Sequence, residues 1–360
     1  MLPAIAGHSA PVLDFGGPFS LIRLASAVKT LADSAAAAAT PPLPPAIEED
    51  LVRVEARLDA ELRSREDRLH AIATHLVAAG GKRVRPLVVL LVYHASAGER
   101  PLLRRADATL AAVALELIHS ATLLHDDIID RGETRRGRPS APSTFGVADT
   151  LVTGDFLFSR AFALCAGFEP EVIRWAAEAC ISLTEGEIMQ GRFRHNPAVT
   201  VADYLEIVER KTASLFAAGA RTAAHLAGAP PALVDTMGSC GRHLGLAFQM
   251  SDDLLDVEGQ PALTGKPRGV DLRDGNPSLP IVLALARDGE LARLFASERL
   301  VAADIEAGLA RIRLTGVLTA VAERARAHTD AALATLAELP DSPYRSALFA
   351  LTHGLAERPS

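Results

Sequence analysis

The same acidic pattern occurs twice in this chain, each time at the end of an apolar stretch with helical spacing. The first copy, DDIID, covers Asp126–Asp130, and the second, DDLLD, covers Asp252–Asp256. At 3.6 residues per turn, the first and last aspartates of each copy stack on one helix face, with the middle one beside them. These carboxylates repel each other, and a helix C-terminus disfavours negative charge. Both helices therefore need cations at the ends that carry the clusters.

The rest of the sequence favours helices over strands. Aromatic residues make up only 4% of the chain, while alanine and leucine, which lose little freedom in a helix, are abundant. Apolar residues recur at helical spacing from Leu51 to Leu76, which predicts one helix ending at Gly80-Gly81. Further helices are predicted over 83–97, 106–130, 148–167, 171–192, 201–228 and 232–257. We therefore expect an all-α protein.

The first 45 residues differ in composition from the rest. Residues 34–45 read SAAAAATPPLPP, an alanine tract that closes in prolines, which cannot continue a helix. We therefore predict a low-complexity, disordered tail over 1–45 and one helical domain over 46–360.

Charge and cysteine content exclude several classes of protein. A formal net charge of -7 argues against nucleic acid as a partner. The three cysteines are widely spaced and form no C-x-x-C pair, which predicts neither a disulfide framework nor a zinc site. We find no uninterrupted apolar run long enough to span a membrane, and no basic segment before an apolar block of the secretory type. These features predict a cytoplasmic protein without a transmembrane segment.

Magnesium is the cation that best fits the two acidic clusters. Mg²⁺ prefers oxygen ligands and is usually held by one or two carboxylates together with substrate phosphate oxygens. A single DxxxD pair is most often a solvated helix edge. Two copies with the same spacing, each followed by a loop rich in glycine and basic residues, predict Mg²⁺ ions bound around one diphosphate. These ions would neutralise the charge that develops as the diphosphate leaves.

Basic residues form two further groups. Lys82 and Arg85 lie in GGKRVRP at a helix start, where the glycines let backbone N–H groups approach a phosphate. Arg135 and Arg136 follow the first acidic cluster, and on an extended loop their side chains point to opposite sides. His119 lies two helical turns before Asp126, on nearly the same face. The alternatives are an ordinary solvated turn for the first group and a packed core position for the histidine.

Together these segments resemble the trans-polyprenyl diphosphate synthases, the chain-elongating prenyltransferases of isoprenoid biosynthesis. GGKRVRP, IHSATLLHDDIIDRGETRRG, VTGDFLFSRAF, ERKTASLF, GLAFQMSDDLLD and the Gly265-Lys266 step follow the family's order and spacing. LPDSPYRSAL near the C-terminus resembles the long-chain members, such as octaprenyl and solanesyl diphosphate synthases. The resemblance implies a Mg²⁺-dependent transferase that joins isopentenyl diphosphate head-to-tail to an allylic diphosphate and makes a long all-trans product.

The resemblance also implies a fold and a set of site residues. The fold is the isoprenoid synthase fold, a single large helical bundle with a central cavity, normally a homodimer, with about three Mg²⁺ ions between the acidic motifs. The metal ligands fall on Asp126, Asp127, Asp130, Asp252, Asp253 and Asp256. The isopentenyl diphosphate site falls on Lys82, Arg85, His119 and Arg136, and the allylic diphosphate contacts fall on Arg135, Lys211 and Lys266. Thr212 and Gln249 lie where the family steadies a carbocation, so Lys211, Thr212, Gln249 and Lys266 are the expected catalytic residues.

Two positions bear on substrate and product. Many family members carry a second lysine in a G-K-x-T-L-P stretch, where this chain has Asn276 after Gly275. Product length is expected to depend on Ile118, Ala121 and Thr122, which lie one to two turns before the first acidic motif on the side of the growing tail. None of these three is Phe or Tyr, which in the family stop growth early, so a long product is expected.

Three alternatives remain open at this point. A geranylgeranyl or farnesyl diphosphate synthase would share every motif. A class I terpene cyclase would share one DDxxD, but its second metal motif normally mixes Asn or Asp with Ser/Thr and Glu. A non-catalytic subunit of a heteromeric synthase would be expected to have lost acidic residues, whereas all six aspartates are present here.

Overall fold

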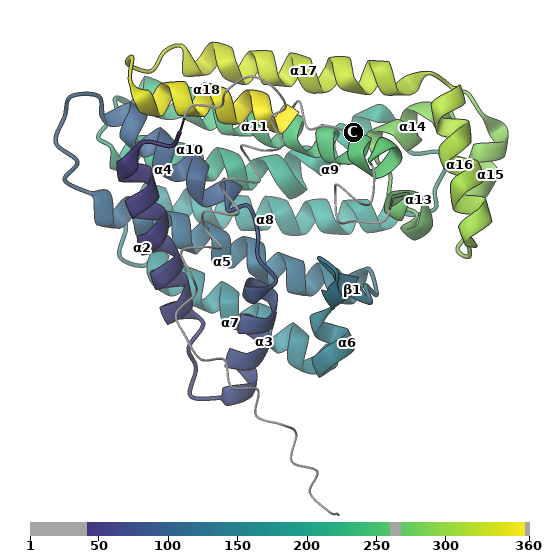
Figure 1. Ribbon diagram of the computed structural model, residues 1–360, viewed down its shortest axis with the longest axis horizontal. Helices are drawn as coiled ribbons and strands as arrows, with labels where there is room; N and C mark the ends of the chain where they lie inside the picture. The colour runs from purple at the N-terminus through teal and green to yellow at the C-terminus, as the bar shows by residue number, and fades with distance from the viewer. Residues whose placement is uncertain (1–41, 260–267, 357–360) are drawn as a thin grey trace, which may run out of the picture.

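The computed structural model describes residues 42–259 and 268–356, and within them the chain is a large assembly of helices (Figure 1). The all-α prediction is confirmed. In chain order the helices are α2 (Pro45–Glu61), α3 (Asp67–Ala78), α4 (Val84–Ala97), α5 (Arg105–Ile129), α6 (Ala141–Phe145), α7 (Val147–Cys165), α8 (Pro170–Phe193), α9 (Val201–Val208), the π-helical turn η1 (Glu209–Ala213), α10 (Ser214–Leu226), α11 (Pro231–Glu258), α13 (Val270–Asp274), α14 (Leu279–Leu285), α15 (Gly289–Phe295), α16 (Ala302–Leu314), α17 (Val317–Leu336) and α18 (Pro343–Ala356). A short antiparallel hairpin, β1 (Thr134–Arg135) with β2 (Arg138–Pro139), follows α5.

The described residues bury two hydrophobic cores. The larger core surrounds α4, in which every residue but Arg85 is buried, and includes α5, α10 and the first half of α11. The smaller core joins the end of α11 to α14, α15, α16 and α17. In Figure 1, α17 and α18 run along one side of α11, and α13 to α16 gather at its far end. Because α11 contributes to both cores, its second half, which carries DDLLD, is fixed from two sides.

The helix predicted from residue 46 to Gly80-Gly81 is broken, and that part of the prediction was wrong. α2 ends at Glu61 and α3 begins at Asp67. The Ser64 hydroxyl accepts a hydrogen bond from the Glu66 N–H at 3.1 Å, and such local side-chain bonds compete with helix continuation. α2 begins at Pro45, where a proline suits the first helical turn, and the boundary between tail and domain near residue 46 stays a prediction. Most of the predicted tail, residues 1–41, lies outside the described part of the chain.

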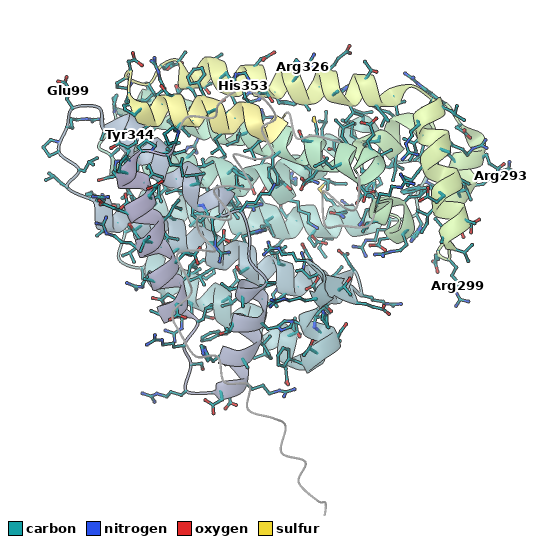
Figure 2. All side chains as sticks on the ribbon, viewed as in Figure 1. Glu99, Arg293, Arg299, Arg326, Tyr344 and His353 are labelled. Atoms are coloured by element: carbon teal, nitrogen blue, oxygen red, sulfur yellow. The ribbon has the colours of Figure 1, made fainter. Side chains whose placement is uncertain are left out.

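Helix α5 is long and apolar enough to cross a membrane by length and composition, although it contains no uninterrupted apolar run of that length. In the structure, 72% of its apolar window is buried inside the protein. It packs against α7, α4, α2 and α10, so these neighbours cover its apolar surface. Figure 2 shows the contrast with peripheral charged side chains such as Arg293, Arg299 and Arg326, which project away from the helices. The burial of α5 gives it the character of a core helix that carries DDIID to one end of the bundle.

Candidate active site

The first acidic motif lies at the C-terminal end of α5. Asp127 is 3% exposed and accepts hydrogen bonds from Arg135 of the β1–β2 hairpin, at 2.8 Å from Nε and 2.7 Å from Nη2. The Gly132 N–H donates to the Asp127 carbonyl at 2.9 Å and folds the hairpin back over the helix end. The other carboxylate oxygen, Oδ2, is buried and has no hydrogen-bond partner. Since a buried acceptor without a partner costs free energy, this oxygen is suited to a cation.

Asp126 faces a lysine from another helix. Lys211 Nζ lies 3.7 Å from Asp126 Oδ1 and also forms an ion pair with Glu187 of α8. Burial raises the pKa of Asp126 to about 6, which Lys211 opposes and the nearby Glu187 and Asp130 reinforce. Glu187 did not emerge from the sequence, where it reads as one of several helix-surface acids. Only the packing of α8 against η1 brings it to the motif.

The turn η1 places two adjacent residues against different motifs. Lys211 points to the first motif, whereas the Thr212 hydroxyl donates to Gln249 Oε1 at 3.0 Å, next to the second motif. A Cβ on Gly186 of α8 would lie 2.7 Å from the backbone nitrogen of Lys211. The absence of a side chain at Gly186 therefore permits the close approach of η1 to α8. π-helical turns are rare and frequent at functional sites. The structure thus brings together Lys211, Thr212 and Gln249, as expected for catalytic residues that share one site.

In the second motif, Asp253 is the centre of a buried hydrogen-bond network. It accepts from the Tyr204 hydroxyl at 2.7 Å, from Gln249 Nε2 at 3.0 Å and from the Leu279 N–H at 3.0 Å. Burial raises its pKa to about 6, while these three donors act in the opposite direction. Tyr204 was also missed by the sequence analysis, because a lone tyrosine in a helix carries no distinctive spacing. The network fixes the carboxylate and the Gln249 side chain in one orientation.

The other two aspartates of this motif have different surroundings. Asp256 accepts from the Val270 N–H at 3.0 Å and from the Asp271 N–H at 3.2 Å, and so anchors the first turn of α13. Asp271 is half-buried, and desolvation together with neighbouring carboxylates raises its pKa well above the usual range. Asp252 lies within electrostatic reach of Arg85, whose guanidinium it helps keep protonated. The second motif therefore borders the basic group at the start of α4.

Four basic or imidazole side chains form that group. The Arg85 guanidinium lies 4.8 Å from the centre of the Phe216 ring, and its Nε is buried without a hydrogen-bond partner. Arg136 lies against Gly81, because a Cβ there would be 3.2 Å from its Nη1. Burial and the nearby Arg85 and Arg136 hold the pKa of His119 well below its usual range, so its imidazole is neutral. Lys82 is half-buried at the same helix start.

Arg83, the remaining cation of GGKRVRP, has a structural role. It donates to Glu55 of α2 at 2.6 Å and to Glu116 of α5 at 2.9 Å. Its backbone is left-handed, with φ of 49°. The pairing also assigns Glu116, which the sequence left without a role. Arg83 ties the start of α4 to two core helices and leaves Arg85 for a ligand.

The three residues expected to control product length lie on α5 as predicted. Ile118 and Ala121 are buried, at 1% and 0% exposed. Thr122 is half-buried, and its hydroxyl donates to the His119 carbonyl at 2.8 Å. Lys266, by contrast, lies outside the described residues, so its role stays a prediction.

The donors of the site suit Mg²⁺ that brings further ligands with it. Within residues 42–259 and 268–356, no three Asp, Glu, His or Cys side chains converge to hold an ion by themselves. The two motifs instead present carboxylate oxygens, one of them the partnerless Oδ2 of Asp127. Mg²⁺ usually binds through one or two carboxylates and completes its shell with water and phosphate oxygens. The residues present therefore fit Mg²⁺ bound together with a diphosphate.

The raised pKa values predict how metal binding depends on pH. Asp126 and Asp253 both have a pKa of about 6, and a protonated carboxyl group is a poor Mg²⁺ ligand. The apparent Mg²⁺ affinity should therefore fall about tenfold per pH unit as the pH drops below 6, and level off above neutrality. Stability without metal should change in the opposite direction. The contribution of Asp126 and Asp253 to that stability should be complete below their unfolded-state pKa of 3.8 and be lost as the pH rises through 6, because the folded state holds protons that the unfolded chain releases.

Calorimetric Mg²⁺ titrations and denaturant unfolding, each at a series of pH values between 4 and 8, check both trends. A Mg²⁺ affinity independent of pH over this range would contradict the assignment of these carboxylates.

Comparisons with known proteins agree with this geometry. A family model described as polyprenyl synthetase matches residues 66–307. The octaprenyl diphosphate synthase of Escherichia coli (strain K12) is 35% identical over 321 residues, which cover 86% of this chain and 96% of that protein. The nonaprenyl diphosphate synthase of Mycobacterium tuberculosis is 35% identical over 319 residues, covering 85% and 91%. A crystal structure of polyprenyl synthase from Caulobacter crescentus CB15, complexed with calcium and isoprenyl diphosphate, aligns with a TM-score of 0.82 at 34% identity over 92% of this chain and 98% of that one.

Proposed function

The chain belongs to the polyprenyl synthetase family, and we propose that it adds isopentenyl diphosphate units head-to-tail to an allylic diphosphate to make a long-chain all-trans polyprenyl diphosphate. It is a prenyltransferase with long-chain octaprenyl and nonaprenyl diphosphate synthases among its relatives. One observation carries the proposal: η1 connects two DDxxD motifs, through Lys211 to the first and through Thr212 and Gln249 to the second. A terpene cyclase would not need a second DDxxD, and a non-catalytic subunit would not need both motifs intact.

The metal-binding residues are the six aspartates of the two motifs. They would hold about three Mg²⁺ ions, which when bound would supply the positive charge that the departing diphosphate needs. The complex of the Caulobacter crescentus relative with calcium and isoprenyl diphosphate supports a site for a divalent cation together with a diphosphate. The partnerless Oδ2 of Asp127 is a buried carboxylate oxygen that suits such an ion.

The basic residues divide between two diphosphates. The allylic diphosphate is held by Arg135 and Lys211, which contact the first motif. Lys266, which lies outside the described residues, is assigned to the same diphosphate by resemblance. Isopentenyl diphosphate is held without metal by four side chains: Arg85, Arg136, Lys82 and neutral His119. Arg83 is not among them, because it already forms ion pairs with Glu55 and Glu116. The two groups leave the reacting carbon atoms between them, close to η1.

The reaction proceeds by ionisation, condensation and elimination. The oxygens of Thr212 and Gln249 lie 3.0 Å apart and present partial negative charge toward an allylic carbocation. The Gln249 amide cannot turn away, since its Nε2 is held by Asp253. The departing diphosphate accepts the proton that is eliminated. His119 is a poor proton acceptor, because burial and the surrounding arginines hold its pKa well below its usual range.

The test is to incubate purified protein with Mg²⁺, farnesyl diphosphate and labelled isopentenyl diphosphate and to measure chain length after dephosphorylation. Linear alcohols longer than geranylgeraniol are expected. A product that stops at geranylgeraniol would overturn the long-chain assignment. No incorporation of isopentenyl diphosphate would favour a cyclase or a subunit that requires a partner.

We further propose that the active form is a homodimer. Helices α7 and α8 leave large apolar side chains exposed, which for a folded protein marks an interaction surface. On α8, Ile181 and Ile188 are 59% and 66% exposed and lie two turns apart on one face. On α7, Val152 and Phe162 are 55% and 44% exposed. A second copy of the chain is the simplest partner for these helices, because most closed assemblies are symmetric dimers.

Changing both Ile181 and Ile188 to glutamate should convert the dimer to a monomer, because charges buried at an interface without partners oppose association. Sedimentation velocity or light scattering measures the outcome. Leu314→Glu, at a position 87% exposed on α16, is the matched control and should leave the mass unchanged. A double variant that keeps the mass of the parent protein would place the interface elsewhere.

A cytoplasmic location is proposed from the thiols. Cys165, Cys180 and Cys240 are all free, and burial raises the pKa of each to about 11, which makes them unreactive. Unpaired thiols suit a reducing compartment. Cell fractionation with an antibody to the chain tests this, and recovery in an exported fraction would refute it.

A further inference from the structure

The third aspartate of the first motif is paired with an arginine that lies outside the motifs on which the family resemblance was based. Arg194 directly follows α8, and its Nη2 forms an ion pair with Asp130. Its Nη1 donates to the Ile129 carbonyl at 3.4 Å. The side chain is only 20% exposed, and Nε is buried without a hydrogen-bond partner. Arg194 is thus a desolvated cation at the metal site with a donor to spare.

This contact completes a pattern across the first motif. Each of its three aspartates is paired with one cation, and the cations come from three different elements: Arg135 from the hairpin, Lys211 from η1 and Arg194 from the end of α8. Arg135 and Lys211 are the residues to which the proposed function assigns the allylic diphosphate. A metal ion bound by Asp130 would compete with Arg194 for that carboxylate, whereas Asp127 keeps Oδ2 for an ion while Arg135 holds Oδ1.

The surroundings of Arg194 place it beside the second motif's loop as well. One helical turn earlier, Gln190 Nε2 donates to Asn276 Oδ1 at 3.0 Å. One residue later, the His195 N–H donates to the Gly275 carbonyl at 3.0 Å. Arg194 therefore lies between two bonds that fix α8 to the chain at 275–276. Asn276 has a neutral amide at the position where many family members carry a lysine. The positive charge at this edge of the site therefore comes from Arg194, which directly follows α8.

We propose that Arg194 is a diphosphate-binding residue that exchanges ligands: it neutralises Asp130 in the metal-free protein and binds the allylic diphosphate once metal ions occupy the motif. The guanidinium group suits both roles, since its planar fork of donors matches a carboxylate and a phosphate equally well. Its position at a helix C-terminus stabilises the charge in either state. The assignment rests on the proposed function only for the identity of the diphosphate.

Exchange makes a prediction that a structural arginine does not. In Arg194→Gln, Mn²⁺ added alone should bind the substrate-free protein more tightly, by about threefold to tenfold, because a competing cation has been removed. Inorganic pyrophosphate added with saturating Mg²⁺ should bind more weakly, by about tenfold, because a charge-assisted hydrogen bond has been lost. Electron paramagnetic resonance titration of Mn²⁺ and calorimetry with pyrophosphate measure the two constants.

The matched control is Arg192→Gln, an exposed arginine on the last turn of α8, which should change neither constant. Arg194→Lys keeps the charge without the fork, and should leave Mn²⁺ binding near that of the parent protein while weakening pyrophosphate about threefold. If Arg194→Gln fails to fold, Arg194→Lys alone decides.

Opposite changes in the two constants support the exchange. Equal losses of both, or no change in either, overturn it. Neither measurement involves turnover, so a chain that binds as described but does not elongate isopentenyl diphosphate would refute the proposed function and leave this assignment standing.

Discussion

Asp127→Asn is expected to lower kcat by about 10²- to 10³-fold while leaving the fold intact. The carboxylate is held in place by Arg135 at 2.8 Å, and its second oxygen is buried without a partner. An amide keeps the shape of the side chain but removes the negative charge that a magnesium ion requires, and it can present an NH₂ group to that ion. Incorporation of labelled isopentenyl diphosphate, measured across a range of Mg²⁺ concentrations, gives kcat and the metal dependence together. The loss should not be restored by high Mg²⁺.

Asp330→Asn serves as the control, because Asp330 is exposed on α17, remote in sequence from either motif. It should retain the activity of the parent protein. A thermal unfolding midpoint for Asp127→Asn within a few degrees of that of the parent protein would exclude misfolding as the cause. If its kcat stayed within about threefold of the parent value, well short of the loss typical for a transition-state contact, the first motif would not be the metal site.

Ala121→Phe should shorten the product to farnesyl or geranylgeranyl length while the first condensation continues. Ala121 is 0% exposed on α5, five residues before the first motif, on the helix side assigned to the growing tail. A phenyl ring there would fill the space that a longer chain needs. Overpacking of a core costs about 1–3 kcal/mol, so the variant should fold with reduced stability. Chain-length analysis of the dephosphorylated products is the measurement.

The control for this variant is Ala112→Phe. Ala112 is also 0% exposed on α5, but nine residues earlier, which places it on the opposite face of the helix. It should destabilise the protein by a similar amount without shortening the product. Equal shortening in both variants would show that general distortion of α5, rather than a blocked path, limits the chain.

The helices could be predicted from the sequence because their apolar period is strong and their ends are marked. Proline begins α2, α8 and α11 within a residue or two of the predicted starts. The break between α2 and α3 could not be predicted in the same way. The apolar face continues through it, and the competing Ser64 to Glu66 hydrogen bond is a local contact that periodicity does not report.

The site was predictable to the extent that its residues lie in repeated or clustered motifs. The structure brings Lys211 to Asp126 of the first motif and links Thr212 through Gln249 to Asp253 of the second, while the roles that the resemblance implies for these residues stay predictions. Glu187 and Arg194 were missed, since a single charge on a helix is usually solvated, and only tertiary packing brings these two to the first motif. The ion pair of Arg194 with Asp130 helps to offset the repulsion among the carboxylates of this motif, whereas Glu187 adds to it.

Arg83 shows the reverse difficulty. In the sequence it is one of three cations in a single turn and is indistinguishable from Arg85. In the structure it is consumed by Glu55 and Glu116, which lie 28 and 33 residues away along the chain. Spacing identifies a basic turn, but only the positions of the acidic partners decide which of its charges can reach a ligand.

The π-helical turn η1 has a consequence for how this chain can change. A π turn holds one residue more than the α-helix around it, so an otherwise regular helix runs from α9 into α10 with a single inserted position. Deleting one residue there would restore an unbroken α-helical ladder, but it would rotate Lys211 and Thr212 away from Asp126 and Gln249. A regular α-helix at η1 is therefore incompatible with the contacts that Lys211 and Thr212 make to the two motifs. Selection for a more stable helix and selection for catalytic activity therefore favour opposite changes in the five residues of η1.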